Sequence, residues 1–271
     1  MKPARRVAST LAWKFNERAL APITGLVLTY DLEEFTSFLM VPDIQQAATL
    51  YLNFIDEQVH CVFNGSMPQF ASRVPDLNHR ELFRKVGTPI HRKFLGDGAM
   101  FIFDVTAMSS RERDLLVKAA CIRSWDLKNY FHLLNEAARE FMPVHDMPKN
   151  IRFGVTYGTI HELKRSDGES EFIGFPINLA TRLQKYAGAA SFLASARLPL
   201  SHDWFTELGF VKVRPTRLRN RNNDYVYIDQ NDLRSAPSDM FEDVLDVPPT
   251  SAAGATDTPS APLATVLANK D

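Results

Sequence analysis

The stretch Gly25-Leu-Val-Leu-Thr-Tyr-Asp31 decides the fold, because it is an apolar run of strand length that ends on an acidic residue. A continuous apolar run of this length predicts a buried central strand. A carboxylate at the end of a buried strand is costly unless something pairs with it or binds it. Asp31 is therefore a candidate functional residue.

A second acidic residue, Asp97, lies between two glycines in Lys93-Phe-Leu-Gly-Asp-Gly-Ala-Met100. Apolar runs flank this Gly-Asp-Gly turn at 90–95 and 99–103, which predicts a β-hairpin. The glycines would let a substrate or a metal approach the backbone closely. Taken alone, Asp31 could be a helix cap or turn former, and Asp97 an ordinary turn residue. Together they are what a magnesium–triphosphate site requires.

Apolar spacing also predicts the helices. Helical spacing runs from Ile44 to Val62, and Ser109 with Glu112 forms a capping-box pattern that opens a long amphipathic stretch. A further helix is predicted to begin near Pro176, and further strands at 151–157, 191–196, 209–213 and 225–228. The order strand, helix, hairpin, helix, strand predicts an α+β fold: one mainly antiparallel sheet with helices packed on it and a ferredoxin-like core.

Composition divides the chain into three segments. Residues 1–24 resemble a short helical lead-in that Pro22 stops. Residues 25–233 form one globular domain, with an insertion or ordered loop at 65–87. From residue 234 to residue 271 the chain is rich in Pro, Ala, Ser, Thr and Asp without periodicity, which predicts a flexible tail.

Charge and cysteine content exclude several classes of function. The 271 residues include 31 basic and 32 acidic side chains, a net charge of −1, so neither nucleic acid nor an anionic membrane is expected as a bulk partner. No run approaches the ~18 uncharged apolar residues of a membrane span. Cys61 and Cys121 fall in helix-like apolar patterns, so we expect two reduced, buried thiols. We expect a cytoplasmic protein.

A third stretch, Glu171-Phe-Ile-Gly-Phe-Pro-Ile-Asn178-Leu-Ala-Thr-Arg182-Leu, carries two further candidates. Asn178 and Arg182 are four residues apart, so on a helix they share a face. Asn can orient a ribose, and Arg offers a forked set of donors to a phosphate. The alternative for such a pair is an ordinary solvated helix face.

Four motifs now resemble those of class III nucleotidyl cyclases, in the same order and spacing. They are Asp31-Leu-Glu-Glu-Phe-Thr, Lys93-Phe-Leu-Gly-Asp97, Ile151-Arg-Phe-Gly-Val-Thr-Tyr-Gly158 and Gly174-Phe-Pro-Ile-Asn178-Leu-Ala-Thr-Arg182. The resemblance covers residues 25–230. It implies that the domain 25–233 is a cyclase catalytic domain with the palm-type sheet of that family.

The resemblance also implies roles for individual residues. Asp31 and Asp97 match the two metal-binding aspartates of the family, and the Leu32 carbonyl matches a backbone ligand for two Mg²⁺ or Mn²⁺ ions. Asn178 and Arg182 match the pair that acts on the transition state. The substrate-binding positions are the phosphate-holding turn at Phe35 and Thr36, the base-reading pair Lys93 and Glu171, and the late basic residue Arg219, for which Arg217 is a rival.

Class III cyclases assemble their site across a head-to-tail dimer, with metals from one chain and the Asn/Arg pair from the other. Because this chain carries both halves, the resemblance implies a homodimer with two equivalent sites. The implied reaction is attack of the ribose 3′-OH of a nucleoside triphosphate on the α-phosphate, with pyrophosphate leaving.

The two base-reading residues depart from the commonest pattern in adenylate cyclases, in which Lys is paired with Asp or Thr. Lys93 and Glu171 could hydrogen-bond adenine or uracil, and the longer Glu171 beside bulky Phe172 favours a smaller ring. A compact cyclase with a short lead-in resembles the pyrimidine cyclases of Pycsar anti-phage defence, whose cyclic UMP or cyclic CMP activates a separate effector protein. The favoured substrate is UTP, with ATP as the alternative.

Two other functions compete with this interpretation. A diguanylate cyclase palm would account for the hairpin around Asp97, but it leaves Asp31 with its Phe-Thr turn and the pair Asn178 and Arg182 without roles. A catalytically silent cyclase-like domain would only bind a nucleotide or regulate a partner. Such a binder has no need of a transition-state pair, so the residues favour an enzyme.

Overall fold

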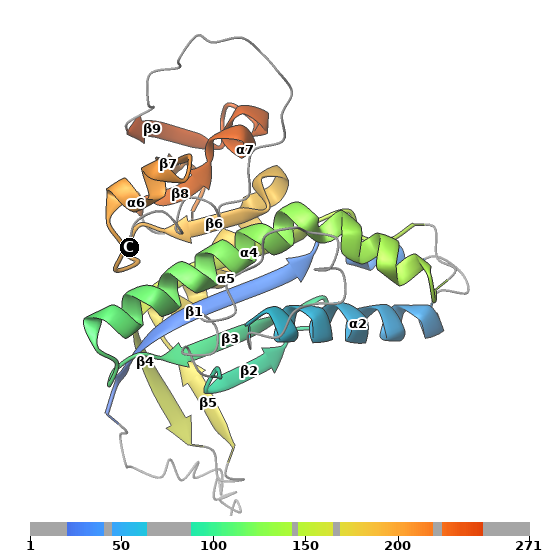
Figure 1. Ribbon diagram of the computed structural model, residues 1–271, viewed down its shortest axis with the longest axis horizontal. Coiled ribbons are helices and arrows are strands. Elements are labelled where there is room, and N and C mark those ends of the chain that lie inside the picture. The colour runs from blue at the N-terminus through green and yellow to red at the C-terminus, as the bar shows by residue number, and fades with distance from the viewer. Residues whose placement is uncertain are drawn as a thin grey trace, which may run out of the picture.

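The computed structural model describes residues 21–40, 45–63, 88–142, 146–164, 169–218 and 224–245. Its sheet is built around β1 (Ile23–Leu32), which lies between β3 (Gly98–Asp104) and β4 (Ile151–Lys164) and is antiparallel to both. Strand β2 (His91–Phe94) pairs with the outer side of β3, so the hairpin predicted around Asp97 is confirmed. Figure 1 shows these strands as the centre of the molecule.

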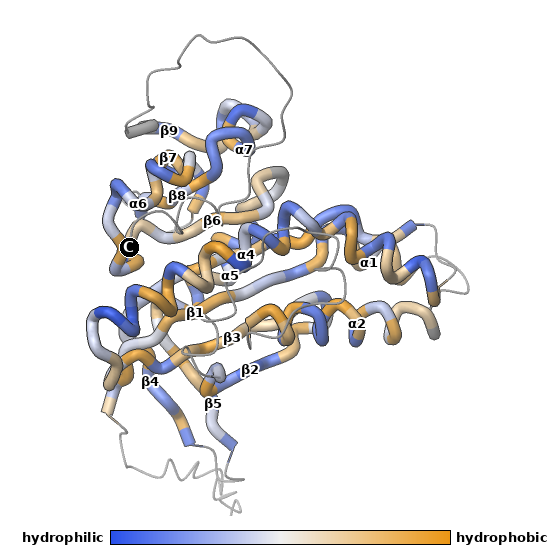
Figure 2. The backbone as a smooth tube through the Cα atoms, in the orientation of Figure 1, coloured by the Kyte–Doolittle hydropathy of each residue, from blue (hydrophilic) through white to orange (hydrophobic). Residues whose placement is uncertain are grey.

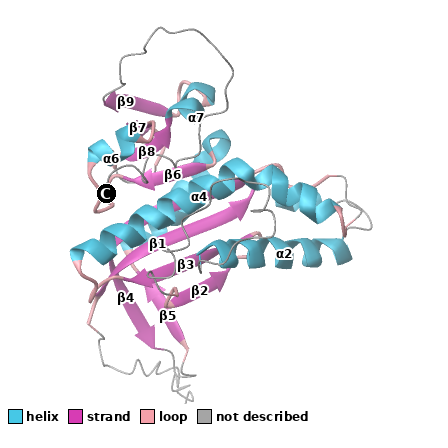
Figure 3. Ribbon diagram, in the orientation of Figure 1, coloured by secondary structure: helices cyan, strands magenta, loops and turns pink. Residues whose placement is uncertain are grey.

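The strand order β2-β3-β1-β4 is the antiparallel order of a ferredoxin-like core, as predicted. Helices α2 (Gln45–Phe63) and α4 (Ser110–Arg139) cover one face, and α5 (Phe175–Ala187) packs on the other, against β4 and β1. The α+β class with helices packed on the sheet is visible in Figure 3. The predicted capping box is present at the start of α4, where Ser109 and Glu112 bond to each other's backbone amides.

Side chains of β1 point alternately to the two faces of the sheet, and each face packs against different helices. Leu26, Leu28 and Tyr30 point into the main core beneath α2 and α4. Val27 points the other way, into a smaller cluster that includes Ala180 of α5. Because successive side chains of a strand point to opposite faces, Asp31 shares the α5 face with Val27. Figure 2 shows hydrophobic β3 beside the more hydrophilic edge strand β2.

Strand β4 is longer than the predicted 151–157: residues 151–160 pair with β1, and residues 161–164 extend past it and pair with β5 (Ser170–Ile173). These two strands form an arm that projects from the sheet in Figure 1. The sequence pattern gave no strand signal for β5. The arm matters for the site because it carries Glu171.

The sheet continues beyond β4 through strands that complete a second, smaller core. Strand β6 (Phe192–Ser195) is parallel to β4, and β8 (Val226–Asp229) and β7 (Phe210–Pro215) follow it. Two short helices and a short 3₁₀ turn join this part: α6 (His202–Glu207), α7 (Gln230–Ser235) and Gly188–Ala190.

The predicted start of the flexible tail at residue 234 is wrong. Helix α7 ends at Ser235, and β9 (Phe241–Leu245) pairs with β7, so ordered structure reaches at least Leu245. The short segment between them, Ala-Pro-Ser-Asp-Met, has no periodicity, but Phe241 is buried in the smaller core, which stabilises the added strand. The lead-in up to residue 20, the insertion at 65–87 and residues 246–271 lie outside the described residues. In the described part of the chain, no helix is both long and apolar enough to cross a membrane.

Candidate active site

The two aspartates lie side by side at one end of the sheet. Asp31 is paired in register with Gly98, the residue that follows Asp97, and the Leu32 amide donates a 2.9 Å hydrogen bond to the Asp97 carbonyl. A Cβ on Gly98 would lie 1.9 Å from the Tyr30 carbonyl oxygen, so this close approach requires glycine. Strand pairing therefore brings together two acidic residues that are far apart in sequence.

Arg152 of β4 holds the Asp31 carboxylate. Its Nε and Nη2 atoms each donate a 2.8 Å hydrogen bond, one to each carboxylate oxygen. Asp31 is only 7% exposed. Burial raises the pKa of the Asp31 carboxyl, whereas the hydrogen bonds and charge of Arg152 lower it and the charge of Asp97 raises it. The carboxylate is thus costly to bury and is stabilised by a cation.

This arrangement suits divalent metal ions. Asp31 already presents both oxygens to a cationic group, and Asp97 adds a second negative charge beside it. Among the described residues, no group of three or more His, Cys, Asp or Glu side chains could hold a metal. Mg²⁺ is commonly held by one or two carboxylates together with substrate phosphates. The donor set therefore fits a metal that binds with a nucleotide.

A tight turn follows Asp31 and leads into the short helix α1 (Phe35–Leu39). Glu34 adopts a left-handed backbone conformation with φ 62°. The Phe35 side chain is buried against Phe38, so only its backbone is available to a phosphate, whereas Thr36 is exposed. Phe35, Thr36 and Asp97 line one hollow, which brings the predicted phosphate-holding turn next to a predicted metal ligand.

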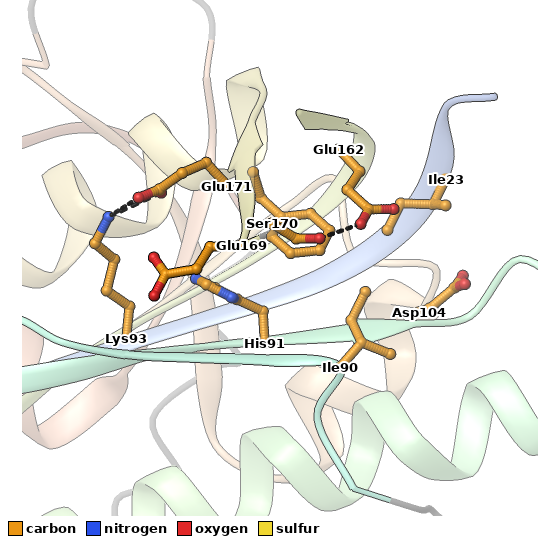
Figure 4. A pocket seen from close by; sticks show the side chains of 10 residues that line it. Ile23, Ile90, His91, Lys93, Asp104, Glu162, Glu169, Ser170 and Glu171 are labelled. Carbon is orange, nitrogen blue, oxygen red and sulfur yellow. Dashed lines mark hydrogen bonds and ion pairs between the residues drawn. The ribbon is translucent and has the colours of Figure 1, made fainter. Parts of the chain in front are cut away.

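Lys93 and Glu171 meet across a second cavity. The Lys93 Nζ atom lies 2.8 and 3.0 Å from the two Glu171 carboxylate oxygens, and both side chains are partly exposed. Figure 4 shows Lys93 reaching from β2 toward Glu171 on the arm. His91, Ser170 and Phe172 also line this cavity. The structure thus brings the two predicted base-reading residues together at a concave surface.

Asn178 and Arg182 lie one turn apart on α5, and both side chains are exposed. The neighbouring Leu179 and Leu183 are buried, as the helical spacing predicted. The helix sits very close to β4: a Cβ on Gly154 would lie 2.1 Å from the Ala180 carbonyl oxygen. Helix α5 therefore presents Asn and Arg together from a firmly seated position.

Comparison with known proteins was informative only at the level of structure. No protein-family model matches the sequence, and no curated protein matches it. The adenylyl cyclase CyaB from P. aeruginosa matches with 18% identity and a TM-score of 0.52, over 76% of this chain and 94% of that chain. The guanylyl cyclase Cya2 matches with 16% identity and a TM-score of 0.52, over 78% and 93%.

A bacterial light-regulated adenylyl cyclase matches with 13% identity and a TM-score of 0.53, over 80% of this chain and 54% of that chain. The chain has the class III cyclase fold. At these sequence identities the likeness concerns the fold alone, so the function of this domain has to be inferred from its own residues.

Within this cyclase fold, one predicted residue cannot be placed. Arg219, the candidate contact for the terminal phosphates, lies outside the described residues. Its rival Arg217 is 75% exposed and pairs with Asp239, which is also on the surface.

Sequence reasoning missed Arg152, although it sits inside a quoted motif. The available signal was a charged residue, Arg152, at the second position of a buried strand, between Ile151 and Phe153. The strand register that places it opposite Asp31 was not visible in the sequence. His91 was missed for the same reason, because its place in the Lys93–Glu171 cavity depends on how the arm folds over β2.

Proposed function

We propose that this protein is a nucleotidyl cyclase that converts a ribonucleoside triphosphate, with UTP favoured, to the 3′,5′-cyclic monophosphate and pyrophosphate. The observation that carries the proposal is the placement of Asp31, at the end of β1, beside Asp97, in the turn that precedes the paired strand β3, within a cyclase fold. The ion pair of Lys93 and Glu171 supports it, because a base-reading pair must meet at one cavity.

The carboxylates of Asp31 and Asp97, with the Leu32 carbonyl, would hold two Mg²⁺ or Mn²⁺ ions. When bound, such ions lower the pKa of the ribose 3′-OH and neutralise the triphosphate. Arg152 also contacts the Asp31 carboxylate. Its guanidinium, once released, would lie beside the same site as a forked donor for phosphate oxygens.

The remaining residues would orient the substrate and stabilise charge. The backbone amides of the turn at Phe35 and Thr36 would hold phosphate oxygens. Asn178 would orient the ribose, and Arg182 would stabilise the charge that develops on the α-phosphate. Loss of such a donor typically lowers the rate by roughly 100-fold or more. Arg219 would contact the terminal phosphates.

The proposed active unit is a homodimer with composite sites. One chain would supply Asp31 and Asp97, and the partner chain would supply Asn178 and Arg182. Both halves are present in this chain, and the α5 pair is exposed rather than buried in its own core, which leaves it accessible to a second copy.

The favoured product is cyclic UMP, acting as a second messenger that activates a separate effector protein in anti-phage defence; cyclic AMP is the alternative product. Support for a pyrimidine comes from Glu171, which is longer than the usual Asp, and from Phe172 beside it in the same cavity. Either base can hydrogen-bond to a Lys and Glu pair, so the choice depends on the shape of the cavity.

The deciding experiment incubates purified protein and Mn²⁺ with equimolar ATP, GTP, CTP and UTP, and identifies cyclic products by mass spectrometry. Cyclic UMP as the main product is expected. Cyclic AMP as the main product would refute the pyrimidine substrate but keep the cyclase. Absence of every cyclic product, with nucleotide binding retained, would favour the catalytically silent domain.

A further inference from the structure

Two aromatic rings form one side of the Lys93–Glu171 cavity. The rings of His91 on β2 and Phe172 on β5 have centroids 4.8 Å apart and planes inclined at 50°, and both residues line the cavity. We refer to His91 and Phe172 as the ring pair. Figure 4 shows His91 beside Lys93 and Glu171 at this surface.

On β2, strand geometry explains why a ring lies beside a polar side chain. His91 and Lys93 are two residues apart on β2, so their side chains leave the same face of the strand. Glu171 and Phe172 are consecutive on β5. Consecutive side chains of a strand point to opposite faces, yet both of these residues line the cavity, so each strand supplies one polar side chain and one ring to it.

Packing beneath Phe172 holds the ring pair in place. Phe172 packs against the cluster formed by Val27, Met100 and Ile102 on the α5 face of the sheet. Ile102 is fully buried, so a swing of the Phe172 ring out of the cavity would expose apolar surface. A ligand would therefore displace the Phe172 ring less readily than it would displace a free surface side chain.

His91 also carries an unused hydrogen-bonding atom. Its Nε2 is buried and has no hydrogen-bond partner in the described part of the chain. Burial lowers the pKa of His91, although the nearby charge of Glu171 opposes this effect. A neutral imidazole can donate or accept at Nε2 according to its tautomer. A buried ring nitrogen without a hydrogen-bond partner is costly.

We propose that the ring pair His91–Phe172 determines which nucleobase this protein accepts. The inference rests on the proposed function, because it assigns the Lys93–Glu171 cavity to the base. With Lys93 and Glu171 hydrogen-bonded to one edge of a base, the ring pair bounds the space beside that edge. A single pyrimidine ring fits there, and the second ring of a purine meets His91 and Phe172.

The experiment compares the wild type with His91→Ala and Phe172→Ala in the competition among the four triphosphates. Each substitution is expected to lower the ratio of pyrimidine to purine product by about 10-fold or more, in line with the discrimination that small changes in a pocket produce. Ile173→Ala is the matched control, because Ile173 is the next residue of β5 and is 51% exposed. Its ratio is expected to stay at the wild-type value.

A ratio within about twofold of the wild type for both folded variants would overturn the inference. Phe172→Leu keeps an apolar side chain and replaces Phe172→Ala if that variant does not fold, which circular dichroism would show. If the wild type prefers ATP but the two variants change that preference, the ring pair stands and the UTP assignment fails.

If no variant makes a cyclic product, the proposed function fails, and calorimetric titration with UTP and with ATP in Mg²⁺ replaces the product ratio. A change in the ratio of the two dissociation constants in His91→Ala and Phe172→Ala, and not in Ile173→Ala, would support the ring pair. Unchanged ratios, or no binding of either nucleotide, would overturn it.

Discussion

Arg152 and Asp31 form a bidentate ion pair across neighbouring strands, with two hydrogen bonds of 2.8 Å each. The side chains are 20% and 10% exposed, respectively. The carboxylate that would hold metal in the proposed mechanism is thus also bound by a partly buried guanidinium. Metal binding and the ion pair draw on the same two oxygen atoms.

Arg152→Ala is expected to lower the free energy of unfolding of the metal-free protein by roughly 3 kcal/mol, because it leaves a buried carboxylate unpaired. Urea denaturation measures this loss. Added Mn²⁺ should recover more stability in the variant than in the wild type, since the metal then meets no competing cation. Arg217→Ala is the control: its pair with Asp239 is exposed, and its loss should cost under about 0.5 kcal/mol. Equal effects of the two substitutions would contradict the role given to Arg152.

Composite sites predict that two inactive variants restore each other. Asp31→Ala and Arg182→Ala are each expected to lower the rate by roughly 100-fold or more on their own. In a one-to-one mixture, half of the dimers are mixed and each contains one intact site of two, so activity should reach about a quarter of the wild-type rate.

The matched control mixes Asp31→Ala with Asp97→Ala. Both changes damage the metal-binding half, so neither site of a mixed dimer is intact and no activity should return. Native mass spectrometry establishes that mixed dimers form. An inactive Asp31→Ala and Arg182→Ala mixture, in the presence of those dimers, would rule out composite sites.

Gly154→Ala tests the seating of α5. The added Cβ would lie 2.1 Å from the Ala180 carbonyl oxygen and 2.7 Å from the Gln184 nitrogen, so the helix must move away from β4. We expect a loss of about 1–3 kcal/mol in unfolding free energy, and a lower rate because Asn178 and Arg182 move with the helix. Thr159→Ala, at an exposed position of the same strand, should change neither quantity. A Gly154→Ala protein with wild-type stability would show that α5 is less tightly seated.

The link between α4 and α7 predicts a pH dependence of stability. Lys128 pairs with Asp232 at 2.6 Å, yet burial raises the pKa of Asp232 to about 6. An unfolded Asp titrates near pH 4 (~3.9), so between about pH 4 and 6 the folded chain keeps a proton that the unfolded chain has released. The contribution of Asp232 to the free energy of unfolding is therefore fully present below about pH 4 and is lost as the pH rises through about 6.

Thermal unfolding of the wild type and Asp232→Asn, followed from pH 4 to pH 7, measures this effect. The stability of the wild type should fall relative to that of the variant over this range, whatever the difference between the two proteins at pH 4. Parallel curves would show that Asp232 titrates normally in the folded protein.

Local patterns in the sequence determined the elements and the identity of most candidate residues. The capping box at Ser109, the Gly-Asp-Gly hairpin and the i, i+4 pair Asn178 and Arg182 each depend on residues within a few positions of one another. Propensity and periodicity act over that range, so these predictions could be made without a structure.

Strand β9 shows where local reasoning was insufficient. Its surroundings read as a tail by composition, yet Phe241 is buried among residues of the smaller core that come from α5, β6, β7 and β8. Burial against distant partners gave this short segment a defined structure. The arm strand β5 is similar, because its pairing with β4 gives it the order that its own pattern did not predict.

The sequence by itself determined that Asp31, Asp97, Lys93 and Glu171 were candidates, because their motifs are local. Only the tertiary structure decided which of them meet. Arg152 reaches Asp31 across 121 positions and Lys93 reaches Glu171 across 78. Such contacts are set by strand register and by the fold of the arm, and a shift of one residue in register would turn each side chain to the opposite face.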